Sequence, residues 1–206
     1  MSGRLVTVFR EQGVRGVWFG ALAWAKAYRR LELVELDLTV PPAPVAAAPA
    51  LDFGFLGDDE LDRLVALGAG PDAVVLRRRL EQGDRCFVAR ESGAIVSARW
   101  VATRRAHIAY LDRSLELEPG DSYLYETFTH PERRGAGVSA AAGTRLALAL
   151  AEEGRRRILA AVLRENGSGT RAYEKAGYRR IGRIGYVKLG PWRRDFQRIE
   201  GRGTGA

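Results

Sequence analysis

Apolar and polar positions change period repeatedly in the second half of the chain, and each change predicts a different element. Residues 122–129 (SYLYETFT) are rich in aromatic and β-branched side chains, which predicts a strand. Residues 138–153 place leucines among alanines and predict a helix that the following glycine ends. After it we expect an apolar strand within 155–166, a short helix within 168–177 and one or two further strands within 178–190.

The first half of the main region predicts a strand followed by two short helices. Residues 51–57 (LDFGFLG) predict the strand, and Asp58 or Asp59 is placed to cap the first helix. The second helix is expected to begin at Pro71 and to stop near Gly83.

Paired strands are predicted between these helices and the strand at 122–129. Residues 85–104 contain two apolar runs around a Ser92–Gly93 turn, the pattern of a β-hairpin. Residues 106–118 predict another extended segment, closed by Pro119 and Gly120. Paired strands followed by strand–helix alternation predict the α/β (α+β) class, with a mixed sheet flanked by helices.

Residues 1–40 differ in character from the rest and predict an amphipathic helix followed by a strand. Trp18, Leu22 and Ala25 share one stripe of that helix, and basic residues lie on both sides of the apolar run. Such a helix suits either an acidic membrane interface or packing against the domain or a second copy of the chain. We favour packing, since Gly16 and Gly20 weaken an isolated helix.

A proline-rich stretch marks the expected domain boundary. Residues 41–50 (PPAPVAAAPA) cannot form regular hydrogen bonds along their length and predict an extended linker. We therefore divide the chain into an N-terminal extension (1–40), this linker, a main domain (51–198) and a flexible tail (199–206).

Composition narrows the partners and the compartment. The net charge of +8 comes almost wholly from arginine, and we interpret it as a solvated surface, so we expect no nucleic-acid partner. One cysteine, Cys86, excludes a disulfide within the chain, and His107 and His130 alone leave no Cys/His metal site. The sequence has no convincing signal peptide or membrane span, so we expect a cytoplasmic setting, with contact at the inner face of the membrane as the alternative.

The stretch HPERRGAGVSAAAG, residues 130–143, carries the clearest chemical signal. Glycines let the backbone approach a ligand closely, and a helix that starts just after them points its unpaired N–H groups at the same place. This combination predicts a phosphate site. A Walker A loop is excluded by the spacing, and the GAGVSA match to a dinucleotide fingerprint is weak because HPERR separates it from its strand.

The same stretch resembles the coenzyme A motif of the GNAT acyltransferases, Arg/Gln-x-x-Gly-x-Gly/Ala between a strand and a helix. The matching residues are Arg134, Gly135, Ala136, Gly137, Val138 and Ser139, with Ser in place of the final Gly or Ala. Residues 160–183 are similar to the downstream half of the family pattern: a strand, an Asn, a short helix and a Tyr-x-x-x-Gly-Tyr ending. The resemblance covers 122–183 closely and 51–120 only in the order of elements.

The resemblance implies a mostly antiparallel, twisted sheet and an acetyl-CoA donor. Backbone amides of residues 134–139 would hold the pyrophosphate of the donor, with Arg133 adding charge. Backbone groups of Phe128 and Thr129 would bind the pantetheine arm as an added strand and orient the thioester carbonyl. Asn166 would hold the same arm, although a helix cap is an alternative role for its side chain.

Tyr173 is the candidate general acid, since it matches the family tyrosine that gives a proton to the departing thiolate. Glu126 is the candidate base because it is the acidic side chain inside the strand that leads to the loop. Alternation places Glu126 opposite Tyr125, but a β-bulge would reverse the faces, so Tyr123 and Tyr125 stay open as alternatives. We expect Tyr178 in the core, His130 in a loop role, and no nucleophilic role for Cys86.

These roles predict direct transfer of an acyl group, most simply acetyl, from coenzyme A to a primary amine in a ternary complex. The acceptor would be a small molecule or a peptide. One alternative is a longer-chain acyltransferase that works on a lipid-linked or cell-surface precursor with the N-terminal helix at a membrane. Another is an acyl-CoA-binding module without turnover. The N-terminal helix is also a candidate homodimer contact.

Overall fold

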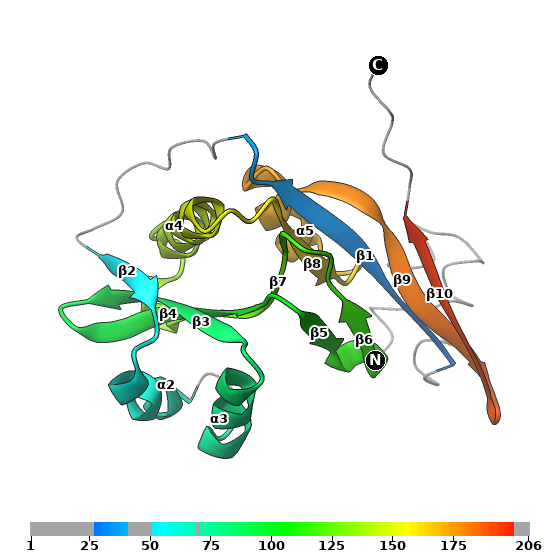
Figure 1. The fold of residues 1–206 in the computed structure, drawn as a ribbon, viewed down its shortest axis with the longest axis horizontal. Helices are drawn as coiled ribbons and strands as arrows, with labels where there is room; N and C mark the ends of the chain where they lie inside the picture. Colours follow the sequence, from blue (N-terminus) through cyan, green and yellow to red (C-terminus); the bar gives the residue numbers. More distant parts are fainter. Residues whose placement is uncertain (1–26, 41–50, 69–70, 200–206) are drawn as a thin grey trace, which may run out of the picture.

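In the computed structural model, the described residues are 27–40, 51–68 and 71–199. They form a large sheet in the order β10-β9-β1-β8-β7-β4-β3-β2 and a separate β5-β6 pair (Figure 1). The strands of the large sheet are β1 (Tyr28–Asp37), β2 (Asp52–Phe55), β3 (Arg85–Glu91), β4 (Ala94–Ala102), β7 (Asp121–Thr129), β8 (Arg157–Val162), β9 (Arg179–Leu189) and β10 (Trp192–Ile199). Strands β7 and β8 pair parallel, whereas the other neighbours in this sheet pair antiparallel.

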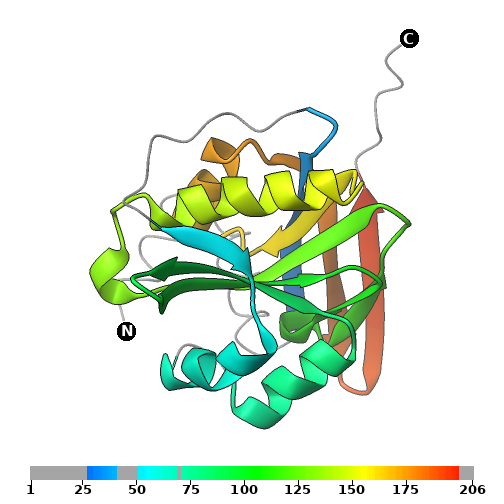
Figure 2. The same ribbon diagram turned by 60° about the vertical axis from the view of Figure 1, so that its left-hand side comes forward.

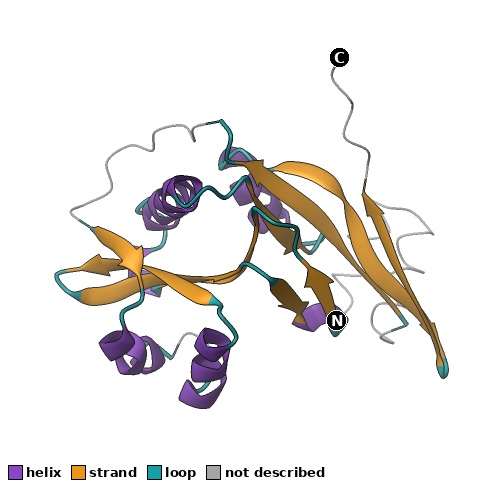
Figure 3. Ribbon diagram, viewed as in Figure 1, coloured by secondary structure: helices purple, strands orange, loops and turns teal. Residues whose placement is uncertain are grey.

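Helices cover the two faces of this sheet (Figures 2 and 3). Helices α4 (Val138–Glu152) and α5 (Gly167–Lys175) lie on one face, and the shorter α2 (Leu61–Ala66) and α3 (Ala73–Glu81) lie on the other. Single 3-10 turns are η1 (Asp58–Glu60), η2 (Ala109–Leu111) and η3 (Pro131–Arg133). The mixed, mostly antiparallel sheet flanked by helices confirms the predicted fold class.

Strand alternation separates two cores along β3 and β4. Phe87 and Val101 pack with Leu146 and Leu150 of α4, whereas neighbouring residues of the same strands pack with α2 and α3. Since successive side chains of a strand point to opposite faces, one apolar strand can serve both layers. The burial accordingly runs without a break from Cys86 to Ala89 in β3 and from Ile95 to Ala102 in β4.

The predicted helix cap at Asp58 or Asp59 is wrong. A 3-10 turn, η1, precedes α2, and the carboxylate that closes it belongs to Glu60, which accepts from the Gly57 N–H at 2.8 Å. The second helix does begin as a capped helix: Asp72 accepts from the N–H of Val75 at 3.0 Å. The longer Glu60 side chain therefore reaches back to the turn, in place of the shorter Asp58 or Asp59 side chain that was expected to cap the helix.

Residues 106–118 are not one extended segment. They fold into β5 (Arg105–Ile108), the turn η2 and β6 (Arg113–Glu116), which pair antiparallel. Asp112 makes the reversal possible with a left-handed φ of 47°, a conformation that Asp tolerates better than most residues.

Strand β1 belongs to the large sheet. It is hydrogen-bonded to β8 on one side and β9 on the other, so the sheet includes part of the predicted N-terminal extension and does not begin at residue 51. Leu31, Leu33 and Val34 are buried there. The predicted helix within residues 16–26, the linker and the tail beyond Ile199 lie outside the described residues.

Candidate active site

Strands β7 and β8 part in the middle of the sheet. They pair from Asp121 and Arg157 as far as Leu124 and Ala160, and β7 then continues to Thr129 beside β4 alone. One edge of β7 is thus left without a strand partner among the described residues. We call this place the opening. A cavity of about 1210 Å³ lies there, lined by parts of β7, β8, α4 and α5.

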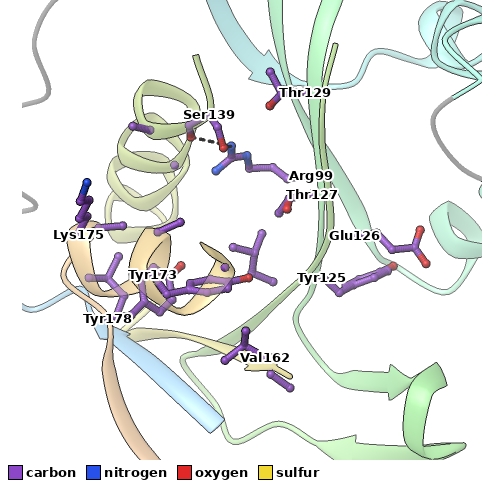
Figure 4. A pocket seen from close by; sticks show the side chains of 18 of the residues that line it. Arg99, Tyr125, Glu126, Thr127, Thr129, Ser139, Val162, Tyr173, Lys175 and Tyr178 are labelled. Atoms are coloured by element: carbon purple, nitrogen blue, oxygen red, sulfur yellow. Dashed lines mark hydrogen bonds between the residues drawn. The ribbon is translucent and has the colours of Figure 1, made fainter. Parts of the chain in front are cut away.

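A β-bulge in β7 sits at the opening. Ala98 pairs with Phe128 and Trp100 with Tyr125, so Arg99 of β4 faces two residues, Glu126 and Thr127. Glu126 takes a φ of 43°, which is uncommon for a residue other than glycine. The β-bulge that we considered as an alternative in the sequence analysis is therefore present. It turns the side chains of Tyr125 and Glu126 away from α4 and α5, as Figure 4 shows.

The glycine loop, residues 134–139, lies at the start of α4. Gly135 and Gly137 have φ values of 80° and 77°, and Gly137 is the N-cap of the helix in the left-handed region. No acidic residue lies in the first turn of α4, whose leading N–H groups have no partner within the helix. Positive charge and free donors therefore meet at an exposed loop, as an anion requires.

Most of the predicted donor-binding residues line the cavity. These are Thr129, Arg134, Gly135, Gly137, Val138, Ser139 and Asn166. Phe128 and Ala136 are not part of its lining, and the carbonyl of Phe128 accepts from the Ser97 hydroxyl at 2.7 Å. The Arg134 guanidinium donates to the carbonyl of Thr129 at 3.2 Å, which braces the loop against the end of β7.

Asn166 is the N-cap of α5, and Tyr173 lies within this helix. The Asn166 side chain caps the helix by accepting from the Gly169 N–H at 3.0 Å while it lines the cavity, so the capping alternative is present. Tyr173 also lines the cavity and meets Tyr178 edge to face, with ring centroids 4.9 Å apart. Burial raises the pKa of Tyr173 and Arg99 partly offsets this, so the hydroxyl stays protonated at neutral pH.

Comparison with solved structures identifies this architecture. A GCN5-related N-acetyltransferase from Sphaerobacter thermophilus aligns over 91% of this chain and 58% of its own, with 14% identity and a TM-score of 0.59. A protein assigned to the GNAT family of acetyltransferases, from Novosphingobium aromaticivorans, aligns over 77% of this chain and 65% of its own, with 19% identity and a TM-score of 0.53. The chain has the GNAT fold.

A third neighbour is a GCN5-related glucosamine N-acetyltransferase region in a fungal multi-domain β-N-acetylglucosaminidase. It aligns over 91% of this chain but only 23% of its own, with 16% identity and a TM-score of 0.55. The chain thus spans less than two thirds of each of these three proteins. No protein-family model and no curated protein sequence matches it.

On the α2–α3 side of this GNAT fold, the charged groups at the opening are paired. Both carboxylate oxygens of Glu126 accept from Arg79 of α3 at 2.6 Å. The same guanidinium lies 5.2 Å from the ring centroids of Trp100 and Tyr125. Tyr125 in turn donates to Asp84.

Burial shifts the Tyr125–Asp84 pair toward its neutral forms. It raises the pKa of Asp84, an effect that the Tyr125 hydroxyl and Arg79 partly offset. Burial, strengthened by the bond to Asp84, also raises the pKa of Tyr125. Sequence reasoning missed Asp84 and Arg79, which no motif marks and which meet Glu126 only through the fold.

Sequence reasoning also missed Arg99, which lies on the α4 side of the same strand region. Among the described arginines, Arg99 alone is buried, with 4% of its surface exposed. It also lines the cavity. A charged residue inside the apolar run AIVSARWVA of β4 was the available signal.

The remaining candidate residues lie in the wall of the cavity or in the core. Arg133 pairs with Glu91 at 2.7 Å and still lines the cavity, while Tyr178 lines it beside Tyr173. Burial raises the pKa of the Cys86 thiol to about 12, which makes a thiolate nucleophile unfavourable. Within residues 27–40, 51–68 and 71–199, no cluster of His, Cys, Asp or Glu could hold a metal ion, and no helix could span a membrane.

Proposed function

We propose that the protein is an N-acyltransferase that moves an acyl group, most simply acetyl, from coenzyme A to a primary amine. One observation carries the proposal: the glycine loop, whose helix start suits an anion, and the protonated Tyr173 line one cavity at the opening between β7 and β8. The neighbours of the fold are acetyltransferases, which agrees with acyl transfer but does not extend to substrates.

The donor would bind along the α4 side of the opening. Amides of the glycine loop would hold the pyrophosphate, and Arg134, exposed on this loop, would add charge. The free edge of β7 after Leu124 would hydrogen-bond the pantetheine arm as a strand does. Asn166 would meet the same arm from its place in the cavity wall.

The chemistry would proceed by direct attack. The amine nitrogen attacks the thioester carbon, the C–N bond forms and the C–S bond breaks. Tyr173 gives its proton to the departing sulfur, and its raised pKa suits an acid that must be protonated beforehand. No covalent enzyme intermediate is required, in keeping with the buried Cys86.

Glu126 is our candidate to accept the proton that the amine loses. It lies at the bulge on the far side of the opening from α4 and lines the cavity, where an acceptor would enter between α3 and β7. Its bond to Arg79 keeps the carboxylate oriented. Tyr125 and Asp84 form a second route, in which the proton passes through the phenol to a carboxylate with a raised pKa.

A longer acyl group is the second candidate donor. The lining of the cavity also includes Leu31, Ile108 and Tyr110, and its volume of about 1210 Å³ is far larger than an acetyl group. A chain of several methylene groups would bury favourable apolar surface there. The membrane-linked acceptor and the N-terminal helix contact stay predictions.

Calorimetric titration with acetyl-CoA, longer-chain acyl-CoAs and desulfo-CoA tests the donor directly. We expect micromolar binding, followed by thiol release when a panel of amines is added. Tighter binding of long chains would move the donor toward lipid chemistry. A protein that bound none of these ligands would refute the proposal.

A further inference from the structure

Arg99 is a buried cation with no counter-ion among the residues that the structure describes. Its guanidinium donates to the carbonyl of Ser139 at 2.8 Å and approaches the Ser139 hydroxyl at 3.4 Å. Its Nε atom is buried and has no hydrogen-bond partner among the described residues. No carboxylate of the described residues pairs with it, although the other enclosed charges in the sheet have partners, such as Glu35 with Arg157 and Arg179.

This arrangement is energetically unfavourable by itself. A buried charge that lacks a partner costs several kcal/mol relative to water, and one neutral carbonyl offsets only part of that. Burial accordingly lowers the pKa of Arg99. A guanidinium in such a place has five donors and too few acceptors, which an anionic oxygen group would supply.

The guanidinium is aimed at the donor side of the cavity. Figure 4 shows Arg99 reaching from β4 toward the first turn of α4, with Ser139 at its tip. A Cβ added to Gly143 would lie 3.0 Å from the Nη1 atom, so the small residue leaves the guanidinium its place under the helix. Ser139 also belongs to the glycine loop, so loop and guanidinium meet at one residue.

We propose that Arg99 is the internal anion receptor of the donor site and pairs with an anionic oxygen group of the bound thioester. The inference rests on the proposed function. Two parts of such a donor carry this chemistry: the pyrophosphate held at the glycine loop, and a carboxylate at the end of the acyl chain. Either would complete the hydrogen bonding of the guanidinium inside the cavity.

The test compares the unaltered protein with Arg99→Met, Arg99→Lys and a control, Arg145→Met. Arg145 lies on α4, is exposed and does not line the cavity. Its variant therefore removes one positive charge from the helix that Arg99 contacts, without changing the site. Each protein is titrated with acetyl-CoA, succinyl-CoA and S-acetylpantetheine, which has no phosphate. We expect at least about tenfold weaker binding of the anionic donor in Arg99→Met, partial recovery in Arg99→Lys and no change in the control.

The three ligands separate the two sources of the anion. A loss for acetyl-CoA and succinyl-CoA alike, but not for S-acetylpantetheine, identifies the pyrophosphate. A loss for succinyl-CoA alone identifies an acyl carboxylate. Equal losses for all three ligands, or no loss for any, would overturn the proposal, because Arg99 would then support the fold or do nothing for the ligand.

Thermal unfolding of the unliganded proteins gives a second readout. We expect Arg99→Met to unfold at the same or a higher temperature, since the change removes an unpaired buried charge. A fall of several degrees would instead make Arg99 a structural support of α4 and would count against the inference.

Inorganic pyrophosphate and succinate, tested by the same unfolding assay, separate failure of the inference from failure of the proposed function. Stabilisation of the unaltered protein but not of Arg99→Met, without any thioester binding, would keep the anion site and refute the transferase. Thioester binding of equal affinity in the unaltered protein and in Arg99→Met would keep the proposed function and refute the role of Arg99.

Discussion

The two sides of the opening handle charge in opposite ways. On the α2–α3 side, Glu126 and Arg79 form a two-pronged ion pair and Tyr125 is bonded to Asp84. On the α4 side, the leading amides of the helix have no partner within it, and Arg99 has no carboxylate partner in the described part of the chain. The α2–α3 side pairs its charges within the protein, whereas an anion would supply the acceptors that Arg99 lacks among the described residues. We infer that unpaired hydrogen-bond donors define the donor side, whereas ion pairs and hydrogen bonds already formed within the protein define the acceptor side.

The bulge in β7 lies between these two sides. A regular strand would place Tyr125 and Glu126 on opposite faces, but the extra residue and the φ of 43° at Glu126 bring both to the α3 side. The face toward α4 is thereby left to Arg99 and the neighbouring backbone. One local irregularity thus separates an open donor edge, which carries the Arg99 guanidinium, from an acceptor edge whose charges are paired with each other.

Replacing the general acid should give the largest effect. We expect Tyr173→Phe to lower kcat about 100-fold, since the departing sulfur would lose its proton donor, while donor affinity stays the same. The raised pKa of Tyr173 also predicts that activity in the unaltered enzyme is retained as pH rises and is lost only above the ordinary tyrosine range. Stopped-time thiol release across pH measures both.

Tyr178→Phe is the matched control, because Tyr178 contacts Tyr173 edge to face and lines the same cavity. It should retain activity within a few fold. If the two variants lost turnover equally, the acid assignment would fail and the pair would be a packing unit.

The glycine loop offers the next largest effect. We expect Gly137→Ala to weaken donor binding roughly tenfold, because a left-handed conformation costs an alanine about 1–2 kcal/mol and the bound loop requires it. A Cβ there meets no atom within 4 Å, so the effect is conformational and not a clash.

Gly154→Ala is the control at the other end of α4. Its φ of 78° nearly equals the 77° of Gly137, and a Cβ there also meets nothing within 4 Å. Gly154→Ala should lose about 1 kcal/mol of stability and no donor affinity, whereas Gly137→Ala should lose donor affinity, because a relaxed loop must regain the left-handed conformation to bind. Equal affinities would mean that the loop does not hold the donor.

The acceptor side predicts a smaller change. Glu126→Gln should lower kcat/KM about tenfold and no further, since water can partly replace a base at an exposed site. Asp84→Asn, which leaves an amide oxygen to accept from Tyr125 but no carboxylate to take up a proton, should change kcat/KM by less than about threefold. The reverse order would transfer the role of base to the Tyr125–Asp84 pair.

The donor side was more predictable from sequence than the acceptor side, for a physical reason. The glycine loop is local: residues 134–139 carry both the backbone freedom and the helix start, so adjacent letters contain the signal. Arg79, Asp84 and Glu126 come together only through pairing of distant strands and a bulge whose position no residue type announces. Strand β1 was assigned to an extension for a similar reason, since its partners β8 and β9 follow more than 100 residues later in the chain.

Acid stability gives the smallest predicted effect and tests the paired side by itself. The Arg90 hydrogen bond, with the Gly57 N–H, lowers the pKa of Glu60 to about 2, against desolvation, which raises it. A depressed carboxylate pKa stabilises the fold above the unfolded value of 4.5, and this stability is lost as pH falls toward 2. We expect Glu60→Gln to lower the free energy of unfolding by roughly 1–3 kcal/mol at pH 7 and to differ little from the unaltered protein near pH 2. Urea unfolding at the two pH values measures this.

Donor affinity should not change in Glu60→Gln, because Glu60 holds η1 and α2 to the sheet on the side away from α4. A variant that lost donor binding as well would show that the two sides are coupled.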